Sequence, residues 1–172
     1  SRGLGDVYKR QLEHRTTLTG FKWIARVPDL VFGYEEAIGY CCDPAHVRDK
    51  DGITAAVTMA LLVDSLRIDG RSIQDVLDSF ADRFGLHATA PVTFRVEDVG
   101  LISAAMQQLR STAPAELAGS EVVSVIDLGE GYNGLPPTDG LMLFTAANDR
   151  VIIRPSGTEP KLKCYLEVIL PG

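Results

Sequence analysis

The sequence contains little of what marks a membrane, secreted or nucleic-acid-binding protein. Among its 172 residues, no apolar run approaches the roughly 18 residues that cross a bilayer, and the N-terminus lacks the apolar segment of a signal peptide. The formal net charge is -6, whereas nucleic acids and anionic membranes require a broad basic surface. These absences predict a cytoplasmic protein whose partners include neither nucleic acid nor membrane.

The cysteines and acidic residues do not form a recognisable disulfide or metal pattern. Cys41 and Cys42 are adjacent and Cys164 is distant, which gives neither an even disulfide framework nor a C-x-x-C spacing. The DKDG segment does not read as a calcium loop, because an EF-hand would need an acidic residue where Val47 stands. We therefore expect free thiols and no metal ligands in this chain, with Asp51 acting as a helix cap.

Two amphipathic helices are expected in the first half of the chain. Residues 51–70 begin with Asp51, a suitable N-cap, and end with Gly70, a suitable terminator. Residues 71–85 place Ser72 and Asp75 at the spacing of a capping box before a stop at Gly85. The apolar residues at amphipathic spacing are Ile53, Ala56, Val57, Ala60 and Leu61 in the first helix, and those on one face of the second are Ile73, Val76, Leu77, Phe80 and Phe84.

The remaining segments read as strands, turns and a third helix. The pattern predicts a short strand over residues 17–27 that is broken by a turn at Gly20, and an apolar strand that ends near Phe32. Residues 87–96 are expected to be extended, and residues 98–110 to form a helix with Ile102, Ala105, Met106 and Leu109 inward. Strands are then expected over residues 122–128, 141–144, 148–155 and 161–169, without β-α-β crossovers.

These elements predict a partial α/β domain followed by an α+β domain with an antiparallel sheet and a helix. Hydrophobic residues make up 45% of the composition, enough for a core in one domain or two small ones. Residues 1–11, SRGLGDVYKRQ, have no clear period and resemble a translated cloning adapter, so we interpret them as a non-native or disordered leader. The predicted domains are residues 12–87 and 88–172.

The stretch RPSGTEPKLKCY, residues 154–165, has the composition of an anion-binding loop. Strand alternation places Arg154 and Lys163 where they can converge across the loop. Ser156 and Thr158 offer hydroxyls, and Gly157 permits close approach to the backbone N–H groups. The spacing alone leaves open an ordinary Ser-Gly-Thr turn with solvated cations. A Walker loop is excluded, because the glycine-to-GKS spacing is absent.

This stretch closely resembles the phosphate-binding loop in the last domain of the alpha-D-phosphohexomutase family, the phosphoglucomutases and phosphomannomutases. The family pattern is R-x-S-G-T-E-P followed by a basic residue and an aromatic one. The resemblance implies that the substrate phosphate is bound by Arg154, Ser156, Gly157, Thr158 and Lys163. Lys163 stands where the family often has arginine and lacks its bidentate fork.

A second stretch, FGYEEAIGY, resembles the family's sugar-recognition loop, G-E-x-S-G. The resemblance assigns Glu35 and Glu36 to the sugar hydroxyls, since carboxylates accept hydrogen bonds that hydroxyls donate. Ala37 occupies the serine position of the family pattern, so one hydroxyl contact is lost. By spacing alone the glutamates could also form a solvated acidic turn.

Two flanking segments extend the resemblance. TGFKWI is similar to a family segment that touches the sugar, which implies contacts from Thr19 and Gly20, with Lys22 nearby. HVRDKDG is similar to a segment that supplies a basic residue to the sugar phosphate, which implies a role for Lys50 and weaker candidates in His46 and Arg48.

The resemblance implies an intramolecular phosphotransferase, but in a longer parent protein. Such an enzyme interconverts sugar 1-phosphates with 6- or 5-phosphates through a bisphosphate, using Mg²⁺ and a glucose 1,6-bisphosphate-type activator. The family's serine loop and magnesium loop have no match in this sequence, so we expect no catalytic residue and no metal ligand here. Its partners would be a phosphorylated sugar and the missing N-terminal domains. The alternative is a non-catalytic module that binds sugar phosphates.

Overall fold

The computed structural model describes residues 12–36, 39–157 and 159–171. The chain divides into two compact units, residues 1–65 and 66–172, with the boundary inside helix α2, Gly52–Ile68. None of the helices in the described ranges is long and apolar enough to cross a membrane. All three cysteines are free, as the sequence predicted.

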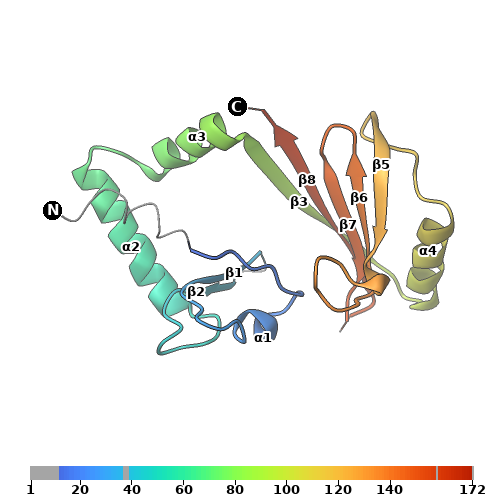
Figure 1. Cartoon of the computed structure of the whole chain (residues 1–172), viewed down its shortest axis with the longest axis horizontal. Coiled ribbons are helices and arrows are strands. Elements are labelled where there is room, and N and C mark those ends of the chain that lie inside the picture. Colours follow the sequence, from blue (N-terminus) through green and yellow to red (C-terminus); the bar gives the residue numbers. More distant parts are fainter. Residues whose placement is uncertain (1–11, 37–38, 158, 172) are drawn as a thin grey trace. The chain divides into compact units, whose positions relative to one another are not determined.

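The first unit is built around a small antiparallel hairpin. Strand β1, Gly33–Glu35, pairs with β2, Gly39–Cys41, so that Glu35 lies opposite Gly39 (Figure 1). The one-turn helix α1, Phe21–Ile24, packs on β1 at Gly33, where a Cβ atom would lie 2.7 Å from Cγ2 of Ile24. Glycine is therefore required for this close approach of helix and strand.

Two strand predictions in this unit are wrong. Residues 17–27 form no strand, because the chain turns at Gly20, with φ +113°, and continues into α1. The carbonyl of Gly20 accepts a hydrogen bond from the Trp23 N–H at 2.9 Å, which closes that turn. The strand expected to end near Phe32 instead begins at Gly33, and the Phe32 side chain is exposed.

The predicted boundaries of the two long helices are confirmed. Asp51 accepts a hydrogen bond from the N–H of Ile53, at the start of α2, and Gly70 lies at φ +67° beyond its end. Helix α3, Ile73–Phe84, begins with the Ser72–Asp75 capping box and ends at Gly85. Local hydrogen bonding therefore fixes both helices as the sequence predicted.

The apolar residues of these two amphipathic helices are largely exposed within the described residues. Ile53 is 79% exposed and Leu61 67% exposed on α2, and Phe84 is 59% exposed on α3. Further exposed apolar residues of α2 are Val57, Met59, Leu62, Val63 and Ile68. Apolar side chains thus surround α2 on several sides, a pattern typical of a helix inside a larger core.

The second unit contains a six-stranded antiparallel sheet and confirms the predicted fold class. The strand order is β3-β8-β7-β6-β5-β4. The strands are β3 Leu86–Arg95, β4 Glu116–Leu117, β5 Ser120–Asp127, β6 Leu141–Thr145, β7 Arg150–Pro155 and β8 Lys161–Leu170. Helix α4, Gly100–Ser111, lies beside the sheet, and a 3-10 turn, Leu128–Glu130, follows β5 (Figure 1).

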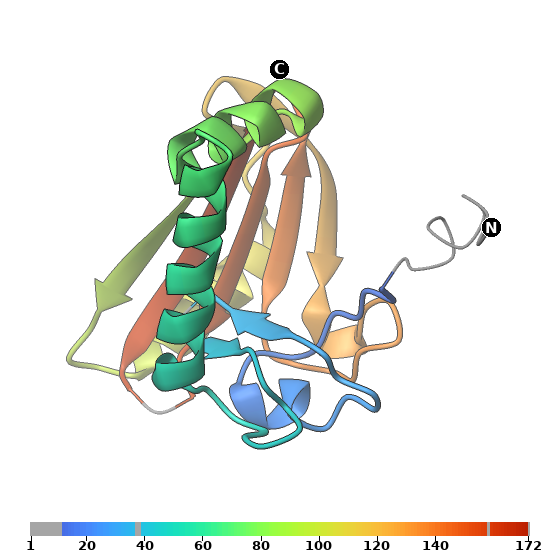
Figure 2. The same ribbon diagram turned by 90° about the vertical axis from the view of Figure 1, so that its left-hand side faces the viewer.

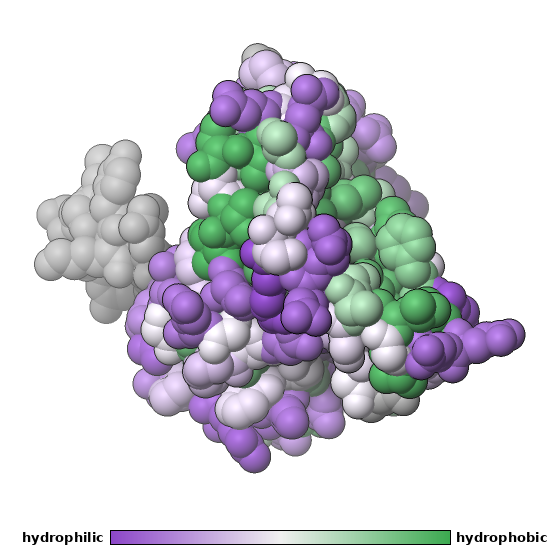
Figure 3. Space-filling model, turned by 90° about the vertical axis from the view of Figure 1, so that its right-hand side faces the viewer, coloured by the Kyte–Doolittle hydropathy of each residue, from purple (hydrophilic) through white to green (hydrophobic). Residues whose placement is uncertain are grey.

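The core of this unit lies between α4 and one face of the sheet. Met106 packs there against Leu141, Leu143 and Ile153, all less than a tenth exposed. Partly buried residues around them are Leu109, Leu117, Val122, Val151, Leu162 and Cys164. The predicted inward face of α4 is confirmed, because Ile102 and Met106 are buried. Hydrophobic side chains also reach the surface in separate patches on the side that carries α4 and β5 (Figure 3).

Because strand residues alternate, the opposite face of the sheet carries Arg154, Lys163 and Tyr165. The loop after β5 folds back at one end of the strands (Figure 2). Arg110 of α4 binds Asp127 at 2.9 Å and Asp139 at 2.6 Å, which ties both ends of this loop to the helix. The hydrogen bond from Arg110 holds the pKa of Asp127 below its usual range.

Candidate functional site

The candidate phosphate loop connects β7 to β8. Arg154 lies directly opposite Lys163 in the antiparallel ladder, and Pro155 lies opposite Leu162. Directly opposed residues point to the same face, so the two cations converge as strand alternation predicted. Their side chains stand on the face of the sheet that α4 does not cover.

Arg154 is held by Tyr165, the aromatic residue that ends the quoted stretch and to which the sequence assigned no role. Its Nη2 donates a hydrogen bond to the Tyr165 hydroxyl at 3.1 Å, and its Cζ lies 5.5 Å from the centre of that ring. Its Nε atom is buried and has no hydrogen-bond partner among the residues that the structure describes. A buried donor without a partner costs free energy.

The backbone of the loop corrects one expectation. The Ser156 N–H donates to the carbonyl of Lys161 at 2.8 Å, so it closes the loop and is not free for an anion. Ser156 retains its hydroxyl as a candidate contact. A Cβ atom on Gly157 would meet nothing within 4 Å, so the packing of the protein itself does not require glycine there. Thr158 lies outside the described residues.

Lys161 is an ion-pair partner within the loop. Its ammonium group contacts the Glu159 carboxylate, and its side chain is only 12% exposed. That hydrogen bond lowers the pKa of Glu159, and the charges of Arg95 and Lys163 act in the same direction. Three cations, Lys161, Arg95 and Lys163, therefore act on the Glu159 carboxylate.

In the first unit, the structure joins two of the predicted sugar-binding residues. The Lys50 Nζ lies 2.6 Å from Oε1 of Glu35, and the Glu35 side chain is only 14% exposed. Gly39, directly across the hairpin, lies beneath both side chains. A Cβ there would fall 2.5 Å from Cγ of Glu35 and 3.1 Å from Cδ of Lys50. The ion pair therefore depends on a glycine that sequence reasoning did not select.

The other candidates of this unit lie around the hairpin. Glu36 and Thr19 are exposed, and Gly20 precedes α1. Lys22 lies over the Trp23 ring at 5.5 Å. Ala37 lies outside the described residues. The structure thus brings Glu35 and Lys50 together and leaves the sugar contacts of Thr19, Gly20 and Glu36 as predictions.

The two weaker candidates have local partners. The Nδ1 atom of His46 lies 2.7 Å from the Asp43 carboxylate, and Arg48 donates to the carbonyl of Val27 at 3.0 Å. Arg48 therefore links the loop after β2 to the segment after α1. These contacts explain both residues without a ligand.

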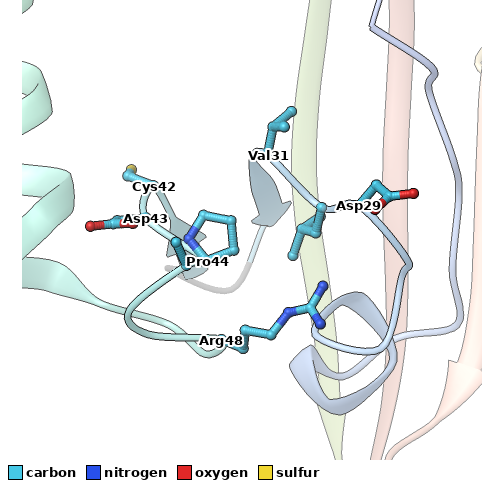
Figure 4. A pocket seen from close by; sticks show the side chains of 8 residues that line it. Asp29, Val31, Cys42, Asp43, Pro44 and Arg48 are labelled. Carbon is cyan, nitrogen blue, oxygen red and sulfur yellow. The ribbon is translucent and has the colours of Figure 1, made fainter.

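A shallow depression of about 650 Å³ lies between residues 29–31 and 42–48. It is at the open end of the hairpin, whereas Glu35 is at the turn end. The carboxylates of Asp29 and Asp43 point away from it, and Val31 and Pro44 line it (Figure 4). Its lining offers few converging polar groups, so we do not assign it to the sugar.

The described ranges contain no group of three or more His, Cys, Asp or Glu residues that could hold a metal ion. The donor set that a magnesium ion prefers, several oxygens at one point, is thus not assembled by these residues. We assign no metal role to the residues of this chain.

Comparison with known proteins identifies the family. The model described as "Phosphoglucomutase/phosphomannomutase, alpha/beta/alpha domain III" matches residues 1–84, and the one described as "Phosphoglucomutase/phosphomannomutase, C-terminal domain" matches residues 101–168. The chain belongs to the phosphoglucomutase/phosphomannomutase family. The domain III match contains the Glu35–Lys50 pair, and the C-terminal match contains the phosphate loop. The match from residue 1 includes the segment interpreted as a leader, and the proposed domain limits stay predictions.

Individual members of the family show the extent of the likeness. A probable phosphomannomutase of Haemophilus influenzae is 41% identical over 97% of this chain and 34% of its own length. The human phosphopentomutase is 34% identical over 95% of this chain and 30% of its own length. The open form of pp63/parafusin from Paramecium, named a phosphoglucomutase, has the same fold, with a TM-score of 0.64 and 18% identity over 87% of this chain and 28% of its own. The chain thus spans about a third of the length of its curated relatives.

Proposed function

We propose that this chain forms the sugar- and phosphate-recognition part of a sugar-phosphate mutase. The whole enzyme would interconvert sugar 1-phosphates with 6- or 5-phosphates through a bisphosphate intermediate. The observation that carries the proposal is the register of β7 and β8, which places Arg154 opposite Lys163 at a Ser-Gly-Thr loop. Membership of the mutase family supports it.

In this proposal the phosphate loop holds whichever phosphate is not reacting. Arg154 supplies a planar fork to two oxygens, and Lys163 supplies a second charge beside it. The Ser156 hydroxyl and the Gly157 N–H complete the cradle, together with Thr158. These groups bind and orient the substrate, which supplies proximity without performing the transfer itself.

The Glu35–Lys50 pair would recognise the sugar. Lys50 contacts Oε1 of Glu35 and would hold the carboxylate so that its remaining lone pairs accept from adjacent sugar hydroxyls. Relatives named phosphomannomutase and phosphopentomutase act on different sugars by name, so we assign the substrate only as a phosphorylated sugar. Thr19, Gly20 and Glu36 are proposed as further sugar contacts.

The phosphoryl group would be transferred by residues outside this chain. We propose a donor serine and Mg²⁺ there, where the ion would neutralise charge on the transferring phosphoryl group, and activation by a sugar bisphosphate. The cytoplasm is the proposed location. A non-catalytic sugar-phosphate module is the competing hypothesis, which would bind the same ligands in a whole protein without turnover.

The first test measures inorganic phosphate binding to the 172-residue chain by NMR titration. Arg154→Ala should weaken binding about ten- to hundredfold, because a hydrogen bond to a charged group contributes about 1.5–3 kcal/mol. Arg150→Ala is the matched control, since Arg150 lies on the same strand and pairs with Glu167 away from the loop. Lys161→Ala is a poor control, because it removes the ion-pair partner of Glu159 and leaves an unpaired carboxylate beside the loop. Equal effects of the two arginine substitutions would show that the loop is an ordinary turn and not a phosphate site.

The second test assays a whole protein that carries this chain on glucose, mannose and ribose 1-phosphates. Turnover of at least one substrate, lost on Arg154→Ala, is expected. Phosphate binding without turnover on any of the three would favour the non-catalytic module.

A further inference from the structure

We propose that Tyr165 is a positioning residue that fixes the guanidinium of Arg154 for phosphate binding. This inference rests on the proposed function above and extends it to a residue without an assigned role. The observation behind it is the pair of contacts between the two side chains, a hydrogen bond to the hydroxyl and a cation over the ring.

The sheet register brings these two side chains together. Tyr165 lies opposite Ile152 on β7, two residues before Arg154, so Arg154 and Tyr165 are diagonal neighbours on one face. Diagonal neighbours across antiparallel strands are within reach of long and aromatic side chains. Lys163 lies on the same strand and face, one side-chain step from Tyr165. Strand β8 therefore sets the positions of both Lys163 and Tyr165, the residue that supports Arg154.

Tyr165 is itself held rigidly. β8 is an inner strand, and Tyr165 is paired with Ile152 of β7 on one side and Pro91 of β3 on the other. An inner strand is paired along both edges, so the backbone that carries the Tyr165 ring is held in place. An arginine that rests on this ring loses much of its rotamer freedom before a ligand arrives.

The contacts orient the guanidinium without using all of its donors. The ring constrains its plane, and the hydroxyl accepts from Nη2, while the buried Nε–H has no partner in the described part of the chain. Tyr165 accepts from one Nη2 N–H only, so the other Nη N–H groups of the guanidinium can be donated to phosphate oxygens, whereas the buried Nε–H is closed to a ligand. Pre-organisation of this kind strengthens binding by lowering the ordering cost at the moment of association.

A double-mutant cycle on inorganic phosphate binding distinguishes positioning from a merely structural role. Tyr165→Phe removes one hydroxyl and should raise the dissociation constant about three- to tenfold, the loss of one hydrogen bond. In the Arg154→Ala background the same substitution should have no further effect, because Tyr165 would act through Arg154. Tyr40→Phe, on the exposed hairpin of the first unit, is the matched control and should leave phosphate binding unchanged.

A second measurement needs no phosphate. The ¹⁵Nε–¹Hε signal of Arg154 should be sharp and slow to exchange with water in the wild-type chain, and broad or fast in Tyr165→Phe. An unchanged signal, or equal losses of phosphate binding in both backgrounds, would overturn the role of Tyr165. Loss of binding in Arg154→Ala but not in Tyr165→Phe would overturn this inference alone. A wild-type chain that binds no phosphate would overturn the proposed function as well.

Discussion

Two glycines illustrate what single residues decide in the candidate sites. Gly39 has no room for a side chain, because Glu35 and Lys50 pass over it, whereas Gly157 has open space around its missing Cβ. The first glycine is explained by packing within the protein. The second is not, and our proposal offers a reason for it, since a glycine would let a phosphate oxygen come close to the backbone of this loop.

Gly39→Ala should disturb the sugar site without disturbing the phosphate site. The added methyl would displace the Glu35 side chain and break its ion pair, with an overpacking cost of about 1–3 kcal/mol. We expect weaker binding of sugar 1-phosphates with unchanged binding of inorganic phosphate, measured by titration of the chain. Gly52→Ala is the control, because a Cβ at Gly52 meets nothing within 4 Å. Similar effects from the two variants would show that Gly39 does not support Glu35.

Glu35→Gln tests whether the carboxylate of Glu35 or that of Glu36 recognises the sugar. The substitution keeps the shape but removes the charge, so charge-assisted hydrogen bonds from sugar hydroxyls, about 1.5–3 kcal/mol each before losses, become neutral ones. In a whole enzyme the ratios of kcat/KM among glucose, mannose and ribose 1-phosphates should change. Glu36→Gln is the paired variant. Unchanged ratios in Glu35→Gln together with altered ratios in Glu36→Gln would reassign the role to Glu36.

Among the elements, hydrogen bonds define the ends of helices α2 and α3, and burial contributes little to these helices. α3 has no buried residue, yet both members of its capping box are formed. The Asp75 carboxylate accepts from the N–H of Ser72 at 2.6 Å, and the Ser72 hydroxyl accepts from the N–H of Asp75 at 3.2 Å. Caps therefore carry more of the stability of α3 than they would in a helix packed on a core.

Ser72→Ala should lower the stability of α3 by about 1 kcal/mol, the usual cost of losing an N-cap side chain. Hydrogen exchange of the α3 amides should accelerate about fivefold, while the amides of the sheet should be unaffected. Ser79→Ala, an exposed position inside the same helix, is the control and should be neutral or slightly protective. Equal acceleration in both variants would show that the cap does not hold the helix.

The same contrast explains how far the sequence could predict this structure. Caps, stops and strand alternation are local, so α2, α3, β7 and β8 were predictable with the facing pair Arg154 and Lys163. The failures at residues 17–27 and at Phe32 occurred where Gly20 and Asp29, both at positive φ, turn the chain away from an extended course. Long-range side-chain partners were also beyond reach. The family pattern marks an aromatic residue at Tyr165, but nothing in the sequence marks it as the acceptor for Arg154.

At the scale of the molecule, Arg110 links helix, sheet and loop in the second unit. It joins α4 to Asp127 at the end of β5 and to Asp139 just before β6. Gly140, the residue after Asp139, lies against Arg154, since a Cβ there would fall 3.4 Å from Cβ of Arg154. The ion pairs therefore fix a loop whose end adjoins the candidate phosphate site.

Arg110→Ala should lower the melting temperature at neutral pH and make that loss pH-dependent. The pKa of Asp127 is lowered in the folded state, so its contribution is present above the unfolded value near 3.9 and is lost as the pH falls through the folded value. Partly exposed ion pairs contribute up to about 1 kcal/mol to the free energy of unfolding. The resulting difference in Tm between wild type and variant should be largest at pH 7 and should shrink towards zero at pH 2. Arg83→Ala, whose guanidinium lies over the Phe84 ring, is the control. A gap that stays constant down to pH 2 would contradict this role.

The sheet order separates local strand pairing from one long-range pairing. Strands β4 to β8 pair with their neighbours in the chain, whereas β3 reaches across to β8, with Leu86 opposite Leu170. Local hairpins form in microseconds, but pairing of distant segments must first overcome the entropy of closing a long loop. Arg154, Lys163 and Tyr165 all lie within one hairpin, so they can meet as soon as β8 has been synthesised. These three side chains would then come together before β3 docks, whereas Pro91, the second strand partner of Tyr165, arrives only with β3.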